Sequence, residues 1–107
     1  MNKVVLLGRL TKAPEIRHIQ NENHTIVARF TLAVDRRGQN NGESSADFIS
    51  CVAFEKCAEF SEKYLTQGKK IAISGHLHTG SYIKNNGSRV YTTEVVIEEI
   101  YFADNVR

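Results

Sequence analysis

Three aromatic residues have the spacing expected of rings that stand together on one exposed surface. Residues 46–54 alternate as a strand whose odd positions are apolar, which leaves Phe48 and Phe54 on the opposite face. The strand expected at residues 70–79 turns its own odd positions inward, and the same alternation directs Tyr82 outward. The expected inward residues of the two strands are Ile49, Cys51 and Ala53, and Ile71, Ile73 and Leu77.

Exposed rings interleaved with Lys and Arg have the properties needed to bind single-stranded nucleic acid. Every base has a π-face that can stack on a ring for about 1–3 kcal/mol, whatever its identity. The cations follow the phosphates and release counterions. Two alternatives stay open: the alternation is reversed and Phe48 and Phe54 face the core, or the two rings are buried between subunits.

Other chemistries find little support in the sequence. There is no Gly-rich phosphate loop, no Ser-His-Asp arrangement that can be recognised locally, and no HExxH or CxxC motif. His76 and His78 project from one strand face and could share a metal ion, but no third ligand is evident. We therefore expect neither an enzyme nor a bound cofactor or metal.

Length and charge limit what the chain can be. Its 107 residues suffice for one domain, and fourteen Lys and Arg against twelve Asp and Glu give a net charge of +2. Any electrostatic argument must therefore rest on where the charges lie. No apolar run reaches the roughly 18 residues that span a membrane. Cys51 and Cys57 lack a motif partner, which favours free thiols in a cytosolic protein.

The elements expected along the chain are strands and one short helix. Strands are expected at residues 4–10 (continuing through 15–19), 26–35, 46–54, 70–79 and 89–102, with a helix at 56–65. Asn85-Asn86-Gly87 predicts a hairpin turn. Three strands, a helix and two strands are the order of the OB-fold. The predicted fold class is all-β with one short helix, a five-stranded OB-fold barrel that forms a single domain over residues 1–107.

Several motifs in register resemble one known family. Residues 2–11 (NKVVLLGRLT) and 14–17 (PEIR) are similar to the opening of bacterial single-stranded-DNA-binding proteins. The pattern continues with FTLAV at 30–34, DFI at 47–49, GHL at 75–77 and YTTEVV at 91–96. The resemblance covers residues 1–103. It implies a homotetramer of OB-folds that binds single-stranded DNA without reading its sequence, in replication, recombination and repair in the bacterial cytosol or nucleoid.

The resemblance also implies roles for individual residues. The family's stacking positions match Phe48, Phe54 and Tyr82, the rings that the alternation selects independently. The remaining candidates for DNA binding are Arg17, Lys56 and Arg89, which match the family's phosphate contacts, the neighbouring cations Arg36, Arg37, Lys69 and Lys70, and the histidines His76 and His78.

The sequence departs from the family pattern in three ways. It has no tryptophan, and the loop after the second strand has Arg36, Arg37 and Gly38 where some members carry an aromatic residue, so one stacking platform is expected to be missing. The family often has arginine or another basic residue near His78 and beyond, where this chain has His76, His78, Gly80 and Ser81, so we expect weaker binding that tightens below about pH 6.5 as the histidines are protonated. The chain stops at Arg107 without a flexible linker and acidic tip, so recruitment of repair and replication partners through a tail is not expected.

Three other functions remain as alternatives. A dimeric OB protein of the replication-restart type would bind single strands but differ in subunit count. A protein-interaction module would use the same rings to contact a protein, and the modest net charge suits it. A detached OB domain of a nucleotidyl-transfer enzyme would need catalytic residues that the sequence does not display.

Overall fold

The structure is a computed structural model that describes residues 1–20, 25–36 and 45–104. Its elements are β1 (Val4–Leu10), β2 (Glu15–His18), β3 (Ile26–Asp35), β4 (Ala46–Phe54), α1 (Glu55–Tyr64), β5 (Lys70–Ile83) and β6 (Arg89–Phe102). The expected order is confirmed, with β2 as the continuation of the first strand. In the part of the chain that is described, no helix combines the length and the apolar character needed to cross a membrane.

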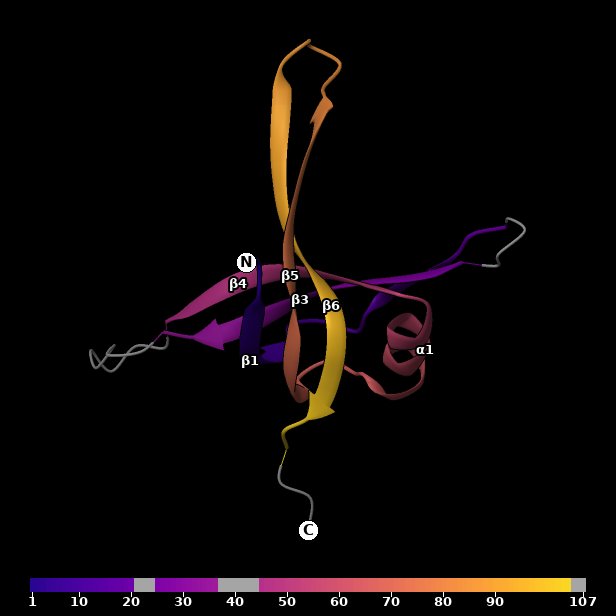
Figure 1. Cartoon of the computed structure of the whole chain (residues 1–107), viewed down its shortest axis with the longest axis vertical. Coiled ribbons are helices and arrows are strands. Elements are labelled where there is room, and N and C mark those ends of the chain that lie inside the picture. The colour runs from indigo at the N-terminus through magenta and orange to yellow at the C-terminus, as the bar shows by residue number, and fades with distance from the viewer. Residues whose placement is uncertain (21–24, 37–44, 105–107) are drawn as a thin grey trace.

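The strands close on themselves around one core (Figure 1). Their order is β1-β5-β6-β4-β3-β2, and β1 also pairs with β3 through Arg9↔Ala33 and Leu10↔Leu32. Five strands therefore form a ring, and β2 extends it along the edge of β3. The pairing of β4 with β6 is parallel, and the others are antiparallel. This is the ring that the predicted five-stranded barrel requires.

The core is formed by the alternate residues that point into this ring. Each of the four longer strands β3 to β6 contributes small and branched side chains, which pack together without a large aromatic except Phe30. The buried set includes Ala28, Leu32, Cys51, Ala53, Ile71, Ile73, Val95 and Ile97. The inward positions predicted for residues 46–54 are therefore confirmed for Cys51 and Ala53, and Ile49 packs against the same cluster.

Helix α1 packs on the ring of strands through two small residues and the partly buried Phe60. Ala58 and Ser61 are fully buried, and the Ser61 hydroxyl donates a hydrogen bond to the Cys57 carbonyl (2.8 Å). Tyr64, at the end of the helix, is 54% exposed. A small residue at the contact allows the helix to approach closely, and Tyr64 then lies beside Phe60 at the surface.

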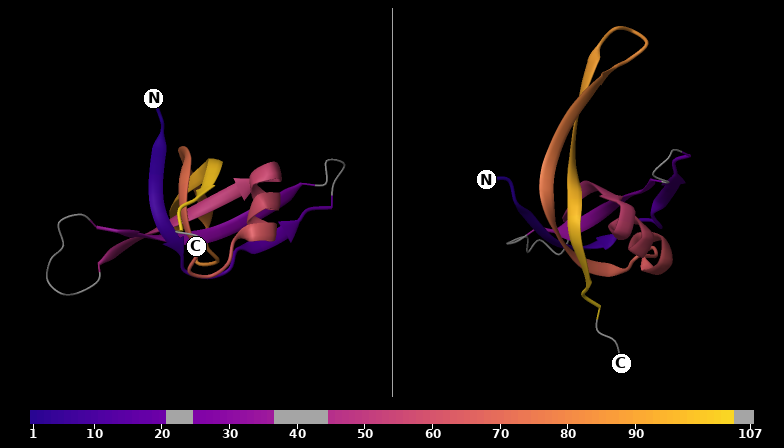
Figure 2. Two further views of the ribbon diagram at one scale, coloured as in Figure 1. Left: turned by 90° about the horizontal axis from the view of Figure 1, so that it is seen from below. Right: turned by 45° about the vertical axis from the view of Figure 1, so that its right-hand side comes forward.

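Strands β5 and β6 continue beyond the ring as a projecting hairpin (Figures 1 and 2). The sequence predicted that the strand beginning at residue 70 ends at residue 79, but β5 reaches Ile83, which pairs with Arg89 across the predicted turn. Gly87 has the positive φ of 87° that this turn needs. Leu77, expected in the core, is 46% exposed because the two strands leave the ring at this level.

A β-bulge lies where the hairpin meets the ring. Ser74 pairs with Glu99 and Gly75 with Ile97, so that Glu98 is the extra residue of β6. A side chain at position 75 would collide with the Val96 carbonyl oxygen, which explains the glycine there. Because Glu98 is an extra residue, the alternation of β6 relative to β5 shifts by one at the bulge. This shift sets which β6 side chains lie on the same face as those of β5 in the hairpin.

Candidate nucleic-acid interface

The three predicted rings stand on one continuous outer face. Directly paired residues of neighbouring strands point to the same side of a sheet. Phe48 pairs with Ala33 and Phe54 with Val27, all on the side of β3 and β4 that faces away from the core. The exposed fractions of the rings are 69% for Phe48, 43% for Phe54 and 54% for Tyr82. The alternative in which the alternation is reversed is therefore wrong.

The register carries this face from the ring onto the hairpin. Val52 of β4 pairs with Val96 of β6, and Val96 pairs with His76 of β5. Following the alternation along both strands leads to the pair Tyr82↔Val90. We call this surface, the outer side of β3, β4 and β6 and the adjoining side of the hairpin, the aromatic face.

Two arginines lie on the aromatic face, and each is paired with a carboxylate. Arg17 pairs with Val27 and Glu15 with Arg29 across β2 and β3. The Arg17 Nε lies 3.6 Å from Glu15 Oε1, and the Arg29 Nε lies 3.5 Å from Glu94 Oε2. Arg29 was not among the sequence candidates. The signal was present, because residue 29 is opposite in phase to the apolar even positions of 26–35.

A polar depression separates the two phenylalanines of β4. Ser50 lies between Phe48 and Phe54 along the strand, and its partner on β3 is Thr31. Both line this depression with Glu15, Arg29 and Glu94. An extended polymer that stacks on both rings would pass over this group of donors and acceptors.

The hairpin presents a different set of side chains. The Arg89 Nη1 donates a hydrogen bond to the Ser81 hydroxyl (2.9 Å), and neither residue is on the same side as Tyr82. Arg89 instead shares the second side of the hairpin with Ile83 and Tyr91, which is 78% exposed. Tyr91 was not singled out from the sequence as a site residue, although it lies in the quoted YTTEVV motif.

The two histidines have different surroundings. His76 Nδ1 lies 2.9 Å from Glu98 Oε2, and Lys3 Nζ lies 3.2 Å from Glu98 Oε1. The hydrogen bond with His76, followed by that from Lys3, lowers the pKa of Glu98. His78 is exposed on the aromatic face, with no ion-pair partner among the described residues. Those residues contain no group of three or more His, Cys, Asp or Glu placed to hold a metal ion.

The other predicted cations are spread over the surface. Arg36 pairs with Asp47 (Nε to Oδ1, 2.9 Å), and Arg37 lies outside the described residues. Lys70 lies opposite Arg9 in the register of β5 and β1, on a different side of the ring of strands. Lys69 Nζ lies 4.8 Å from the centre of the Phe102 ring, also away from the aromatic face. The structure therefore places Arg17 near the exposed aromatic side chains, whereas Lys69 and Lys70 lie away from them.

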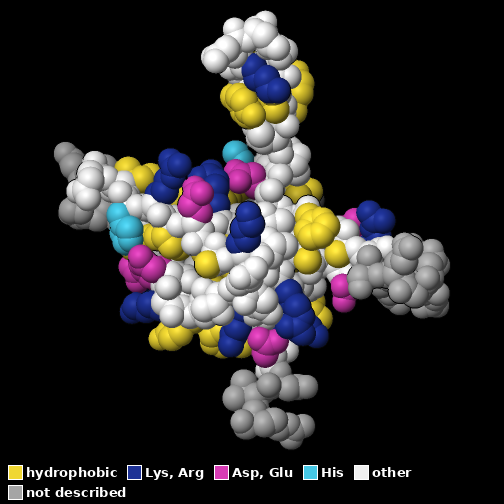
Figure 3. All heavy atoms as spheres, turned by 180° about the vertical axis from the view of Figure 1, so that it is seen from behind, with side chains coloured by type: hydrophobic (Ala, Val, Ile, Leu, Met, Phe, Trp, Pro, Cys, Tyr) yellow, Lys and Arg dark blue, Asp and Glu magenta, His cyan; other side chains and the backbone are white. Residues whose placement is uncertain are grey.

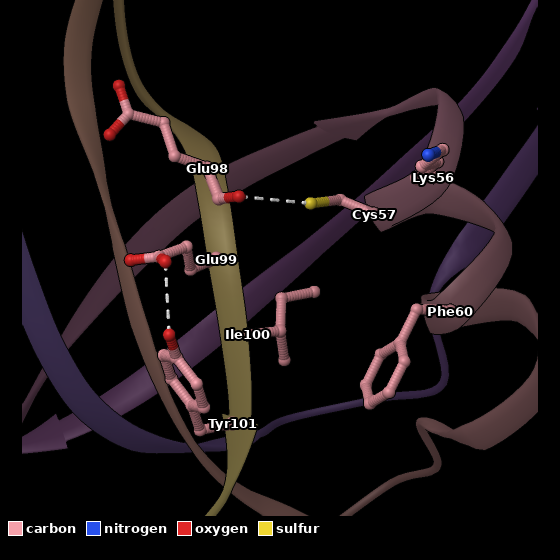
Figure 4. A pocket seen from close by; sticks show the side chains of 7 residues that line it. All are labelled: Lys56, Cys57, Phe60, Glu98, Glu99, Ile100 and Tyr101. Atoms are coloured by element: carbon pink, nitrogen blue, oxygen red, sulfur yellow. Dashed lines mark hydrogen bonds between the residues drawn. The ribbon is translucent and has the colours of Figure 1, made fainter.

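Lys56 and Cys57 line a pocket between α1 and β6 (Figure 4). The Cys57 thiol donates to the Glu98 carbonyl oxygen (3.4 Å), and burial raises the pKa of this thiol. Burial, with a smaller contribution from Glu94, raises the pKa of Cys51 to about 12. Both cysteines are free, as predicted, and both are poor nucleophiles because the thiolate is disfavoured.

Comparison with known proteins agrees with the geometry of the aromatic face. The model of the single-strand binding protein family matches residues 1–103. The single-stranded DNA-binding protein of Clostridium perfringens is 51% identical over 105 residues, which cover 98% of this chain and 67% of the relative. Single-stranded DNA-binding protein 2 of Clostridium acetobutylicum is 47% identical, covering 97% of this chain and 77% of the relative.

A solved structure supports the same relationship. The structure of a Plasmodium falciparum SSB complex with ssDNA superposes with a TM-score of 0.83 at 27% identity, over 97% of this chain and 96% of the other. The likeness confirms the predicted OB-fold. Proteins of the matched family are DNA-binding proteins without enzymatic activity, which agrees with the expectation that this chain is not an enzyme. The chain belongs to the single-strand binding protein family.

Proposed function

We propose that the chain binds single-stranded DNA, without reading its sequence, by stacking bases on Phe48, Phe54 and Tyr82. The observation that carries the proposal is the register of β3, β4, β6 and β5, which places three exposed rings on one face. Duplex DNA keeps its base faces within the stack, so this surface suits single strands. A solved structural neighbour is a complex with ssDNA, which supports the same ligand.

Phosphate contacts complete the proposed interface. Arg17 and Arg29 lie beside the aromatic side chains on β2 and β3, whereas Arg89 lies on the side of the hairpin opposite Tyr82. Lys56 is exposed in the first turn of α1, two residues after Phe54 and next to Glu55, and adds a further cation near this ring. Three stacked bases give on the order of 3–9 kcal/mol per subunit before the cost of ordering the strand. Tight binding therefore needs several linked subunits.

The assembly that we propose is a homotetramer. Val4 to Gly8 pair with β5 on one edge of β1, while pairing with β3 on the other edge is limited to Arg9 and Leu10. The free edge can pair with a second copy of the same strand. Val5, Leu7 and Tyr101 are 70%, 50% and 56% exposed on the adjoining sheet face, which supplies an apolar surface for further contact. Such an assembly fits a role in replication, recombination and repair in the bacterial cytosol.

The test compares a labelled poly-dT strand with a duplex of equal length by fluorescence anisotropy over a range of salt concentrations. We expect strong preference for the single strand, which Phe54→Ala weakens and Phe54→Tyr largely retains because the ring remains. Light scattering of the free protein gives the subunit count. Equal or negligible binding to the two DNA forms would contradict the proposal and favour a protein-interaction role.

A further inference from the structure

The projecting hairpin, residues 79–93, has two solvent-exposed sides, and the proposed function uses one of them. Tyr82 and Val90 belong to the aromatic face. The second side carries the cross-strand pairs Ser81↔Tyr91 and Ile83↔Arg89. Tyr91 is 78% exposed, which makes it the most exposed ring among the described residues. The hairpin stands clear of the ring of strands in the ribbon views (Figures 1 and 2), so no described part of the chain covers this second side.

The charge of the hairpin matches a polyanion. Residues 79–93 include Lys84 and Arg89 and contain no Asp or Glu. No carboxylate of the described residues forms an ion pair with either cation. Basic and apolar side chains occur together on the hairpin in Figure 3, whereas acidic ones gather on the ring of strands. An apolar partner protein would not require this unneutralised charge.

Arg89 is held in place beside Tyr91. Its Nη1 donates to the Ser81 hydroxyl at 2.9 Å, and Ser81 is the cross-strand partner of Tyr91. The guanidinium is therefore fixed next to an exposed ring, with further donors left for an anion. A ring that stacks on a base beside a cation that contacts its phosphate is the combination that single strands require.

We propose that Tyr91 and Arg89 form a second stacking site for single-stranded DNA, on the side of the hairpin opposite Tyr82. The hairpin then acts as a two-sided ribbon, and a strand that leaves Tyr82 passes around it to Tyr91. Lys84 lies at the turn between the two sides, where it can contact the intervening phosphates. This inference rests on the proposed function of the aromatic face and adds a second segment of the same strand.

Strand length separates the two sites. An oligonucleotide of about 8 nucleotides, within the site size of one OB-fold, fills the aromatic face alone. A strand several times longer also reaches Tyr91. We expect Tyr91→Ala to weaken binding of the long strand roughly 5- to 10-fold, the low end for one stacked base, and to leave the short one unchanged. Tyr91→Phe keeps the ring and should bind like the unmodified protein.

The experiment measures dT oligonucleotides of both lengths by anisotropy against Tyr91→Ala, Tyr91→Phe, Tyr82→Ala and Phe54→Ala. If Tyr82→Ala and Phe54→Ala weaken binding while Tyr91→Ala does not, the second site is wrong and the aromatic face stands. If none of the variants weakens binding, the proposed function fails as well. If Tyr91→Ala changes the subunit mass in light scattering, Tyr91 is a contact between copies, and the inference is overturned.

Tyrosine emission gives an independent readout that does not depend on an alanine variant. The chain has four tyrosines and no tryptophan, so its ultraviolet emission comes from tyrosine alone. Stacking on a base quenches a ring. Tyr91→Phe should therefore reduce the quenching amplitude on the long strand and leave it unchanged on the short one. Equal amplitudes for the two proteins on the long strand would contradict a base stacked on Tyr91.

Discussion

The ring of strands and the hairpin carry the same kinds of side chain in different electrostatic arrangements. On the aromatic face, Arg17 is paired with Glu15 and Arg29 with Glu94, at 3.6 and 3.5 Å. On the hairpin, Arg89 is hydrogen-bonded to a neutral hydroxyl. In the proposed interface, the arginines of the first region are already paired with carboxylates, whereas the cations of the second region have no carboxylate partner among the described residues.

This difference explains how a chain with a net charge of +2 can suit a polyanion. A phosphate that displaces a carboxylate from an arginine gains little, because one ion pair replaces another. We therefore expect stacking to supply most of the affinity on the ring of strands. On the hairpin, a phosphate releases counterions without competition, so the salt dependence of binding should originate mainly there.

The largest effect is expected from removing a ring on the aromatic face. Phe54→Ala should weaken binding of a single strand roughly 5- to 150-fold, the range for one stacked base. Because stacking releases no counterions, the slope of log affinity against log salt should stay unchanged. Anisotropy titrations at several salt concentrations measure both quantities. A slope that falls together with the affinity would show that the rings and the phosphate contacts are not separable.

The hairpin cations should behave in the opposite way. Lys84→Gln together with Arg89→Gln should reduce the salt slope by about 0.7 for each phosphate that is no longer neutralised, so that the variant and the unmodified protein converge at high salt. Arg17→Gln serves as the matched control, since its charge is already balanced by Glu15. If Arg17→Gln lowers the slope as much as the hairpin substitutions do, the comparison between the two regions fails.

A smaller effect is expected from removing an acidic partner on the aromatic face. Glu94→Gln frees Arg29 for phosphate, so binding should tighten about two- to five-fold at low salt and the slope should increase. Glu59→Gln makes the same charge change at an exposed position of α1 and controls for net charge. Tightening of equal size in both variants would indicate a general field effect and no specific role for the Glu94–Arg29 pair.

The sequence predicted the order of the elements and the facing of Phe48 and Phe54, because a half-buried strand alternates with period two. It could also have revealed Arg29 by the same alternation. It could not reveal how far the hairpin projects. The same period persists whether or not a two-stranded ribbon still covers a core, so Leu77 was predicted to be interior and is exposed.

The ion pairs of the aromatic face could not be predicted from the sequence because they depend on the register between strands that are distant in the chain. Glu94 meets Arg29 because β6 lies parallel to β4, and β4 pairs with β3. The bulge at Glu98 then sets which β6 residues face outward. Register between strands that are distant in the chain depends on such irregularities, which leave no periodic signal. The cations were therefore selected by type and proximity in sequence, and Lys69 and Lys70 lie elsewhere on the surface as a result.

The smallest effect is expected at the junction between the two regions, where Glu98 bridges His76 and Lys3. The hydrogen bond with His76, then that from Lys3, lowers the pKa of Glu98 below its ordinary 4.5, so the ionised carboxylate stabilises the folded state. This contribution is fully present above pH 4.5 and disappears as the pH falls to the lowered pKa. Denaturant midpoints of the unmodified protein and Glu98→Gln should therefore differ at neutral pH and converge on acidification. Ser74 and Tyr101 lower the pKa of Glu99 in both proteins, so its effect cancels in the difference. A difference that persists or grows at acidic pH would mean that Glu98 holds the bulge through its shape and not through its charge.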